Sequence, residues 1–158
     1  MIRLKKADFT DCEEIHRMQV EAFTELLEKY RDYDTSPACE TLDIIRYKIQ
    51  NSDYYFITNN TEKVGVIRII NRDDTCRISP MFILPKYQNK GYAQTALIAA
   101  EKLYPHIKHW VLDTIKQENK LFHLYTKVGY KPNGREENIK DGMTIIFLEK
   151  RATPAGDT

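Results

Sequence analysis

The chain has 158 residues, of which 42% are hydrophobic, and its formal net charge at pH 7 is +1. This length and composition predict a single globular domain over residues 1–150 and a mobile tail over residues 151–158. The near-neutral charge and the lack of a bilayer-length apolar run argue against a nucleic-acid or membrane partner.

Three cysteines, Cys12, Cys39 and Cys76, lie far apart in the sequence, and the N-terminus lacks the apolar core of a signal peptide. An odd number of cysteines without metal-ligand spacing predicts reduced thiols in a cytoplasmic protein. We therefore expect no metal site and interpret Cys76 as structural. We expect a monomer or a homodimer.

The first elements are a strand and a helix. Alternating apolar and polar residues predict a strand over Ile2–Lys6. Thr10 and Glu13 match a capping box, which predicts that a helix begins there, and its apolar face continues to Tyr30.

A second helix and a meander of strands follow. Ser36 and Pro37 predict a helix start after a loop over residues 31–36, and this helix runs to about Gln50. Apolar runs separated by turn residues then predict three strands, over Tyr54–Thr58, Val64–Ile70 and Cys76–Leu84.

The third strand of the meander leads through a short turn into a helix. Pro80 lies inside the strand and removes a ladder hydrogen bond, which favours an edge or a bulge. Gly91 lies in the turn, and Pro105 ends the helix. Free N–H groups at the helix start predict an anion site. The apolar stripe of this helix is Ala93, Ala96, Leu97, Ala100 and Leu103.

The last part of the chain predicts one more helix between strands. His109–Thr114 reads as a strand parallel to the preceding one, and Asn119–Val128 reads as a helix that ends at Gly129. A strand begins over Tyr130–Pro132. The polar run over residues 133–142 is interpreted as a long hairpin loop, and the last strand is predicted over Met143–Glu149.

Two motifs in this order of elements resemble those of the GCN5-related N-acetyltransferase (GNAT) family, over about Ile2 to Lys150. The turn sequence over residues 88–93, QNKGYA, resembles the Q/R-x-x-G-x-G/A motif, with Gln88 where Arg is frequent. Asn119, Tyr125 and the Gly129–Tyr130 pair resemble N-x5-Y-x3-G-F, with Tyr130 in place of Phe.

The resemblance implies a mixed α/β (α+β) fold. Its central sheet is mixed but mostly antiparallel, splayed at the cofactor-binding strand and flanked by helices. It also implies an acetyl-CoA-dependent N-acetyltransferase that acetylates a primary amine of a small molecule or peptide by direct attack. Two other classes stay open: a non-catalytic acyl-CoA sensor and a protein-interaction module on the same fold.

The resemblance also implies roles for particular residues. Tyr125 would be the general acid that protonates the leaving thiolate, although its apolar stripe alone favours a core tyrosine. Asn119 would bind the pantetheine arm of coenzyme A, although helix signals alone allow a helix N-cap. Backbone groups of Phe82 and Ile83 would bind pantetheine and the thioester. The pyrophosphate would be held by Gln88, Asn89, Lys90, Gly91, Tyr92, Ala93 and Gln94.

The base and the acceptor site are predicted from carboxylates. Asp113 lies near the end of its strand, where two strands should part, and is a candidate base. Tyr30 and Asp34 belong to the loop from Tyr30 to Ser36, which should border the acceptor cleft, and their ring and charge favour a cationic acceptor. Asp34 is a second candidate for a catalytic role, and the alternative is a solvated polar loop.

Overall fold

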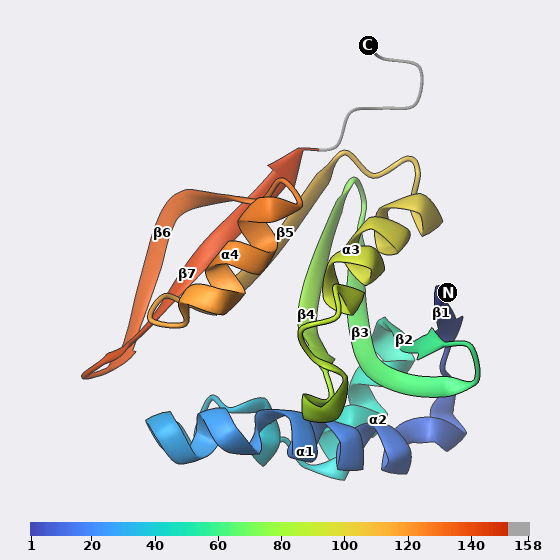
Figure 1. Ribbon diagram of the computed structural model, residues 1–158, viewed down its shortest axis with the longest axis horizontal. Coiled ribbons are helices and arrows are strands. Elements are labelled where there is room, and N and C mark those ends of the chain that lie inside the picture. Colours follow the sequence, from blue (N-terminus) through green and yellow to red (C-terminus); the bar gives the residue numbers. More distant parts are fainter. Residues whose placement is uncertain (152–158) are drawn as a thin grey trace.

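The structure is a computed structural model that describes residues 1–151, so residues 152–158 of the predicted tail lie outside the described part. The α-helices of the described residues, labelled in Figure 1, are α1 (Cys12–Tyr30), α2 (Leu42–Asn51), α3 (Tyr92–Leu103) and α4 (Asn119–Lys127). The strands are β1 (Ile2–Lys6), β2 (Asp53–Asn59), β3 (Glu62–Arg72), β4 (Thr75–Ile83), β5 (His109–Ile115), β6 (Lys131–Lys140) and β7 (Met143–Arg151).

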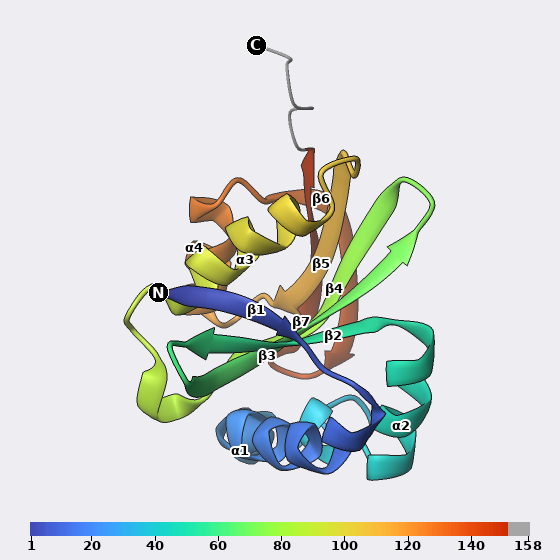
Figure 2. The same ribbon diagram turned by 90° about the vertical axis from the view of Figure 1, so that its right-hand side faces the viewer.

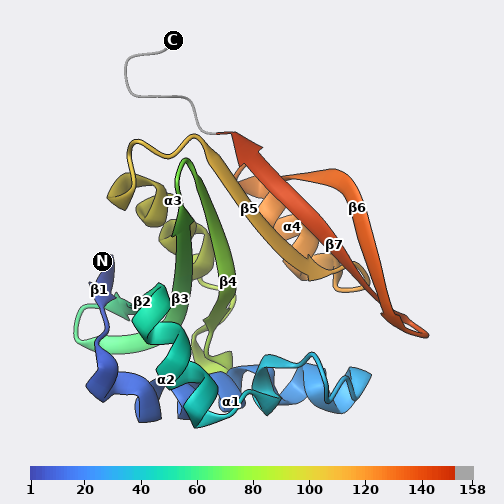
Figure 3. The same cartoon turned by 180° about the vertical axis from the view of Figure 1, so that it is seen from behind.

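The strands form one mixed sheet in the order β1-β2-β3-β4-β5-β7-β6. All neighbours are antiparallel except β4 and β5, which are parallel because α3 connects them, as predicted. This pairing joins Thr75 to His109 at one end and Ile78 to Leu112 at the other, and it goes no further. Beyond Ile78 the two strands diverge, as Figures 1 and 3 show. The predicted splay of the sheet is therefore confirmed.

Helices cover both faces of the half of the sheet that contains β1–β4. In Figure 2, α1 and α2 lie on one side of these strands, and α3 lies on the other. Buried side chains accordingly form two clusters. One contains Ile15 of α1, Ile45 of α2 and Phe82 of β4. The other contains Leu97 of α3 and Tyr125 of α4. The two clusters hold the sheet between two helical layers.

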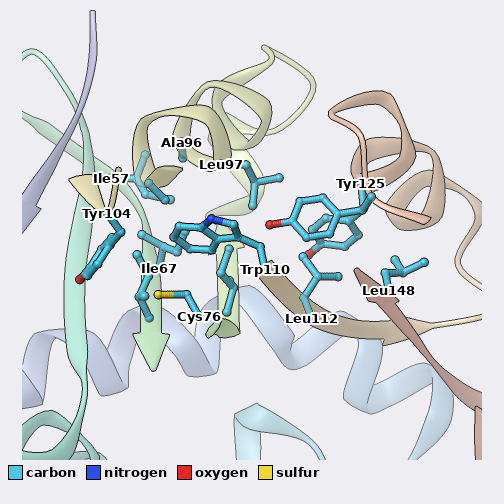
Figure 4. Packing of buried hydrophobic residues seen from close by; sticks show 14 of the residues in the cluster. Ile57, Ile67, Cys76, Ala96, Leu97, Tyr104, Trp110, Leu112, Tyr125 and Leu148 are labelled. Carbon is cyan, nitrogen blue, oxygen red and sulfur yellow. The ribbon is translucent and has the colours of Figure 1, made fainter. Parts of the chain in front are cut away.

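Trp110 is the largest fully buried side chain and lies in the cluster beneath α3 (Figure 4). Its ring meets the edge of Tyr104, with ring centroids 5.9 Å apart. Cys76 belongs to the same cluster, and burial raises the pKa of its thiol to about 11. Leu103, which we expected on the buried stripe of α3, is exposed.

Two predicted helix starts are wrong. The capping box is made by Asp8 and Asp11, not by Thr10 and Glu13, because a 3-10 turn over Phe9–Asp11 precedes α1. Ser36 does cap a turn, but that turn is a separate 3-10 segment over Pro37–Cys39. The helix α2 begins later, after Thr41, whose side chain accepts a hydrogen bond from the backbone N–H of Ile44.

The predicted hairpin loop over residues 133–142 is also wrong. Most of it forms β6, which pairs with β7, and only residues 141 and 142 make the turn. β6 is an edge strand whose residues are nearly all exposed, so the polar pattern that suggested a loop reflects solvent on this strand. No helix within residues 1–151 is long and apolar enough to cross a membrane.

The path of β4 depends on Gly65 of β3. A Cβ atom at Gly65 would lie 2.1 Å from the backbone oxygen of Phe82, which leaves no room for a side chain. We expect Gly65→Ala to lower the free energy of unfolding by about 1–3 kcal/mol, the usual cost of overpacking. Urea unfolding, followed by the fluorescence of Trp110, measures this loss.

Gly134→Ala is the control for the effect of an added methyl group. Gly134 has a φ of +93°, and a Cβ atom there would meet no other atom within 4 Å, so this substitution introduces backbone strain alone. If Gly65→Ala is as stable as the wild-type protein, the close approach of β3 to Phe82 does not constrain β4.

Candidate functional site

A cavity of about 410 Å³ lies where β4 and β5 diverge. Its lining comes from both strands and from the elements around the gap: α1, the loop that follows it, α4, β6 and β7. The site residues that line it include Met81, Phe82, Ile83, Gln88, Asp113 and Tyr125. Gln88 and Tyr125, one residue from each sequence motif, thus meet at one cavity, whereas residues 89–94 and Asn119 do not line it.

The free edge of β4 presents backbone groups to this gap. The side-chain N–H of Gln88 donates to the carbonyl oxygen of Ile83 at 2.9 Å, so this carbonyl points away from β3. The N–H of Leu84, the next residue, donates to Val64 of β3 at 2.8 Å. Backbone N–H and C=O groups of successive residues point alternately to the two sides of a strand. The backbone groups of Met81 and Ile83 therefore face the gap, whereas those of Phe82 face β3.

Gln88 therefore does two things. Its side chain lines the cavity, and its amide connects the turn before α3 to the end of β4 by a hydrogen bond. A hydrogen bond of this kind sets the distance between the turn and the strand edge. The sequence motif did not indicate it.

The turn ends at Gly91, which is the N-cap of α3 and has a φ of +78°. No side chain caps this helix within the described residues, so the N–H groups of its first turn are available. A Cβ at Gly91 would meet nothing within 4 Å, which shows open space in front of the turn. The first turn contains Tyr92, Ala93 and Gln94, while Asn89 and Lys90 are exposed in the turn itself.

Tyr92 is turned into the protein, since its hydroxyl accepts a hydrogen bond from the Asn59 side chain at 3.1 Å. Only its backbone N–H is therefore available to a ligand at the turn.

Asn119 is the first residue of α4, and the N-cap position belongs to Glu118. The interpretation of Asn119 as a helix N-cap is therefore wrong. Its side chain is exposed and makes no hydrogen bond with residues 1–151 that would occupy it. It lies one residue after Glu118, at the end of the β5–α4 connection.

Tyr125 packs in the core and lines the cavity at the same time. It is 7% exposed, and its ring meets that of Tyr130 edge-on, with centroids 6.2 Å apart. Figure 4 shows it among Leu97 and Leu112. Its hydroxyl has no hydrogen-bond partner in the described part of the chain. Burial raises the pKa of Tyr125 above its usual value, and the charge of Asp113 raises it further.

Asp113 lies at the same gap but on the other face of β5. Its carboxylate forms an ion pair with Arg77 of β4, at 2.5 Å. Burial raises the pKa of Asp113, while the guanidinium of Arg77 acts in the opposite direction. The side chain is 26% exposed, so solvent and an acceptor both have access to it.

The structure does not bring Tyr30 and Asp34 to the cavity wall. The hydroxyl of Tyr30 donates to the carboxylate of Glu118, which also pairs with Lys29 at 2.7 Å. This contact joins the end of α1 to the β5–α4 connection. Asp34 is exposed and does not line the cavity. Their predicted role at the acceptor stays a prediction.

Two acidic residues that the sequence analysis did not assign do line the cavity. Asp32 comes from the loop after α1, and Glu137 comes from β6. Glu137 was missed because its segment was interpreted as a loop. Its place two residues from Ile139 would have indicated a shared face once β6 was recognised as a strand. The described residues hold no group of three or more His, Cys, Asp or Glu able to bind a metal ion.

A family model described as "Acetyltransferase (GNAT) family" matches residues 13–130. No curated protein matches the chain in sequence.

Several solved structures with the same fold are acetyltransferases. The chain is similar to the PaiA N-acetyltransferase of Thermoplasma acidophilum, solved with coenzyme A, with 20% identity over 96% of this chain and 99% of that chain and a TM-score of 0.69. It is similar to the ribosomal-protein-S18-alanine N-acetyltransferase of Escherichia coli, with 13% identity over 100% and 98% and a TM-score of 0.78.

A third similar structure is the spermidine N-acetyltransferase of Vibrio cholerae, solved with CoA and spermine. It is 16% identical over 95% of each chain, with a TM-score of 0.74. At these identities the likeness establishes the fold and leaves the acceptor open.

Proposed function

The chain belongs to the GNAT acetyltransferase family, and we propose that it transfers the acetyl group of acetyl-CoA to a primary amine by direct attack. One observation carries this proposal: Gln88, in the turn that leads to the uncapped start of α3, and Tyr125, whose hydroxyl makes no hydrogen bond with residues 1–151, line the same cavity at the β4–β5 gap. An anion at one end and a reacting thioester at the other would fit this arrangement.

Coenzyme A would lie along the free edge of β4. The N–H groups in the first turn of α3 would hold its pyrophosphate, since they are uncapped and the helix dipole favours an anion there. The backbone groups of Met81 and Ile83 that face the gap would bind the pantetheine arm and the thioester. Asn119 would contact the same arm from the start of α4. No metal ion takes part in this proposal.

The reaction consists of one exchange of bonds at the acetyl carbon. The neutral amine forms a C–N bond to this carbon, and the C–S bond then breaks as the thiolate leaves. Backbone N–H groups on β4 stabilise the negative charge on the carbonyl oxygen. Tyr125 gives its proton to the thiolate. Its raised pKa keeps the hydroxyl protonated at neutral pH, so the proton is present when it is needed.

Asp113 is the proposed base, acting directly or through a water molecule. It lies at the gap from the face opposite Tyr125, so an amine between them could lose a proton on one side while the thiolate gains one on the other. Burial makes the carboxylate more basic than an exposed one. Arg77 holds it in place and limits this increase in basicity.

The alternative function is an acyl-CoA sensor without catalysis, and it requires no proton transfer from Tyr125. A sensor requires only the binding groups on β4 and α3. The side chain of Tyr125 favours the enzyme, because it lines the cavity and its hydroxyl, which makes no hydrogen bond with residues 1–151, is free to donate to a leaving thiolate.

Coenzyme A binding at the α3 start is tested by Gly91→Glu. A carboxylate at this position would repel the phosphate oxygens, so we expect calorimetry to show coenzyme A affinity reduced by about a hundredfold or more. Gly91→Gln is the matched control, because it introduces the same bulk and the same backbone strain without the charge. Equal affinity of the two variants would contradict the placement of the pyrophosphate.

General-acid catalysis is tested by Tyr125→Phe. We expect kcat to fall by about 10²-fold, the usual contribution of a positioned acid, with the affinity for acetyl-CoA little changed. Tyr130→Phe is the control, since the Tyr130 hydroxyl is buried without a partner and lies outside the cavity lining. Full turnover in Tyr125→Phe would leave Tyr125 as a core residue. Binding of acetyl-CoA by the wild-type protein without turnover of any amine would favour the sensor.

The role of Asp113 is tested by the pH dependence of kcat at saturating substrates. Arg77 lowers the pKa of Asp113, so Arg77→Gln should raise it and move the acidic limb of the profile to higher pH. Asp113→Asn should lose this limb together with about 10²-fold in kcat. If Arg77→Gln leaves the limb where it is, another group accepts the proton.

A further inference from the structure

A strip of side chains runs across one face of β5, β7 and β6. Asp113 of β5 pairs with Phe147 of β7, and Ile115 pairs with Ile145. Ile145 in turn pairs with Glu137 of β6. Directly paired residues in neighbouring strands project from the same face of a sheet, so these five side chains share one face. The strip therefore has a carboxylate at each end and apolar side chains between them.

No helix of residues 1–151 covers this face. Figures 1 and 3 show α4 on one side of β5 and β7, and the other side is without a helix. All five side chains of the strip line the cavity at the β4–β5 gap. The strip is thus a continuation of the cavity, leading from the gap to the edge of the sheet.

The two carboxylates of the strip differ in their partners. Asp113 is paired with Arg77, whereas Glu137 forms no ion pair with any residue that the structure describes. Asp32 is a further acidic residue of the lining, and no lysine or histidine among residues 1–151 lines the cavity. Tyr125, a residue that is more than nine-tenths buried, lines the same cavity.

The position of Glu137 indicates which part of an acceptor it contacts. Neighbouring strands lie about 4.8 Å apart, so β6 is roughly 10 Å from β5 and from the gap. The proposed base Asp113 already lies beside the reacting amine at the gap, whereas Glu137 lies too far away to take a proton from that amine. At this distance Glu137 can bind a second cation and leave the reacting amine free to lose its proton.

Arg135 of β6 lies over the same strip. Its guanidinium is 4.1 Å from the centre of the Phe147 ring, and the residue is exposed. A positive group therefore already rests against this face, held by a cation–π contact. The same charge would repel a second cation bound at Glu137.

We infer that the acceptor carries two positively charged groups joined by an apolar spacer, and that Glu137 binds the group that does not react. This inference depends on the proposed acetyl transfer. The reacting amine lies at the gap beside Asp113, the spacer crosses Ile145, and the second cation meets Glu137 at the sheet edge. Glu137 determines specificity and takes no part in the chemistry.

The test compares two acceptors of matched length, hexamethylenediamine and hexylamine, in assays of coenzyme A release by the whole protein. We expect kcat/KM for the diamine to exceed that for the monoamine by about tenfold, the effect of one charge-assisted contact. Glu137→Gln should remove this advantage by raising KM for the diamine, with hexylamine kinetics unchanged. Arg135→Gln should lower KM for the diamine only.

Glu136→Gln is the matched control, because Glu136 does not line the cavity and pairs instead with exposed Lys116. It should behave as the wild-type protein with both amines. Equal kcat/KM for the two amines, or a diamine advantage that survives Glu137→Gln, would overturn the inference. An advantage lost in Asp34→Asn but kept in Glu137→Gln would overturn it in favour of the loop after α1.

Failure of the proposed function gives a different result from failure of this inference. Without acetyl transfer, no amine would release coenzyme A from acetyl-CoA above the rate in its absence. With acetyl transfer but a different acceptor class, turnover would be found, and Glu137→Gln would affect hexylamine and the diamine alike.

Discussion

The parting of β4 and β5 beyond Ile78 is the constraint on which the rest of the site depends. Two parallel strands would normally continue their ladder, since unpaired backbone groups inside a protein cost free energy. Here Pro80 has no N–H to offer, and Gly65 lets β3 approach β4 closely from the other side. The backbone groups of Met81 and Ile83 are left without a strand partner, and all of them but the Ile83 carbonyl, which accepts from Gln88, are available to a ligand.

Each group of the proposed mechanism reaches the gap from a different element. The helix α3 brings an uncapped N-terminus, and the amide of Gln88 fixes its distance from β4. The helix α4 brings Tyr125 to one face, and β5 brings Asp113 to the other. Tyr30 and Glu118 connect the end of α1 to the start of α4. The site is open along the face of β5, β7 and β6 that no helix of residues 1–151 covers.

Much of this arrangement was predictable from sequence, because the signals are local. The Gly91 turn and the apolar stripe of α3 indicated a strand followed by a helix, and Pro80 indicated a disturbed ladder. The sequence signals gave wrong predictions where strand pairing or solvent exposure determines the structure. The polar residues of β6 read as a loop because an exposed edge strand needs no apolar alternation. Asp32 rather than Asp34 reaches the cavity, and no local pattern distinguishes two acids in one loop.

The central claim is that coenzyme A binds along the free edge of β4. Residue-resolved amide hydrogen exchange, measured by NMR with and without coenzyme A, tests it most directly. The account predicts that the N–H groups of Met81 and Ile83 exchange more slowly when coenzyme A is bound. The N–H of Phe82, which faces β3, should change much less. Unchanged exchange at Met81 and Ile83 under saturating coenzyme A would contradict the account.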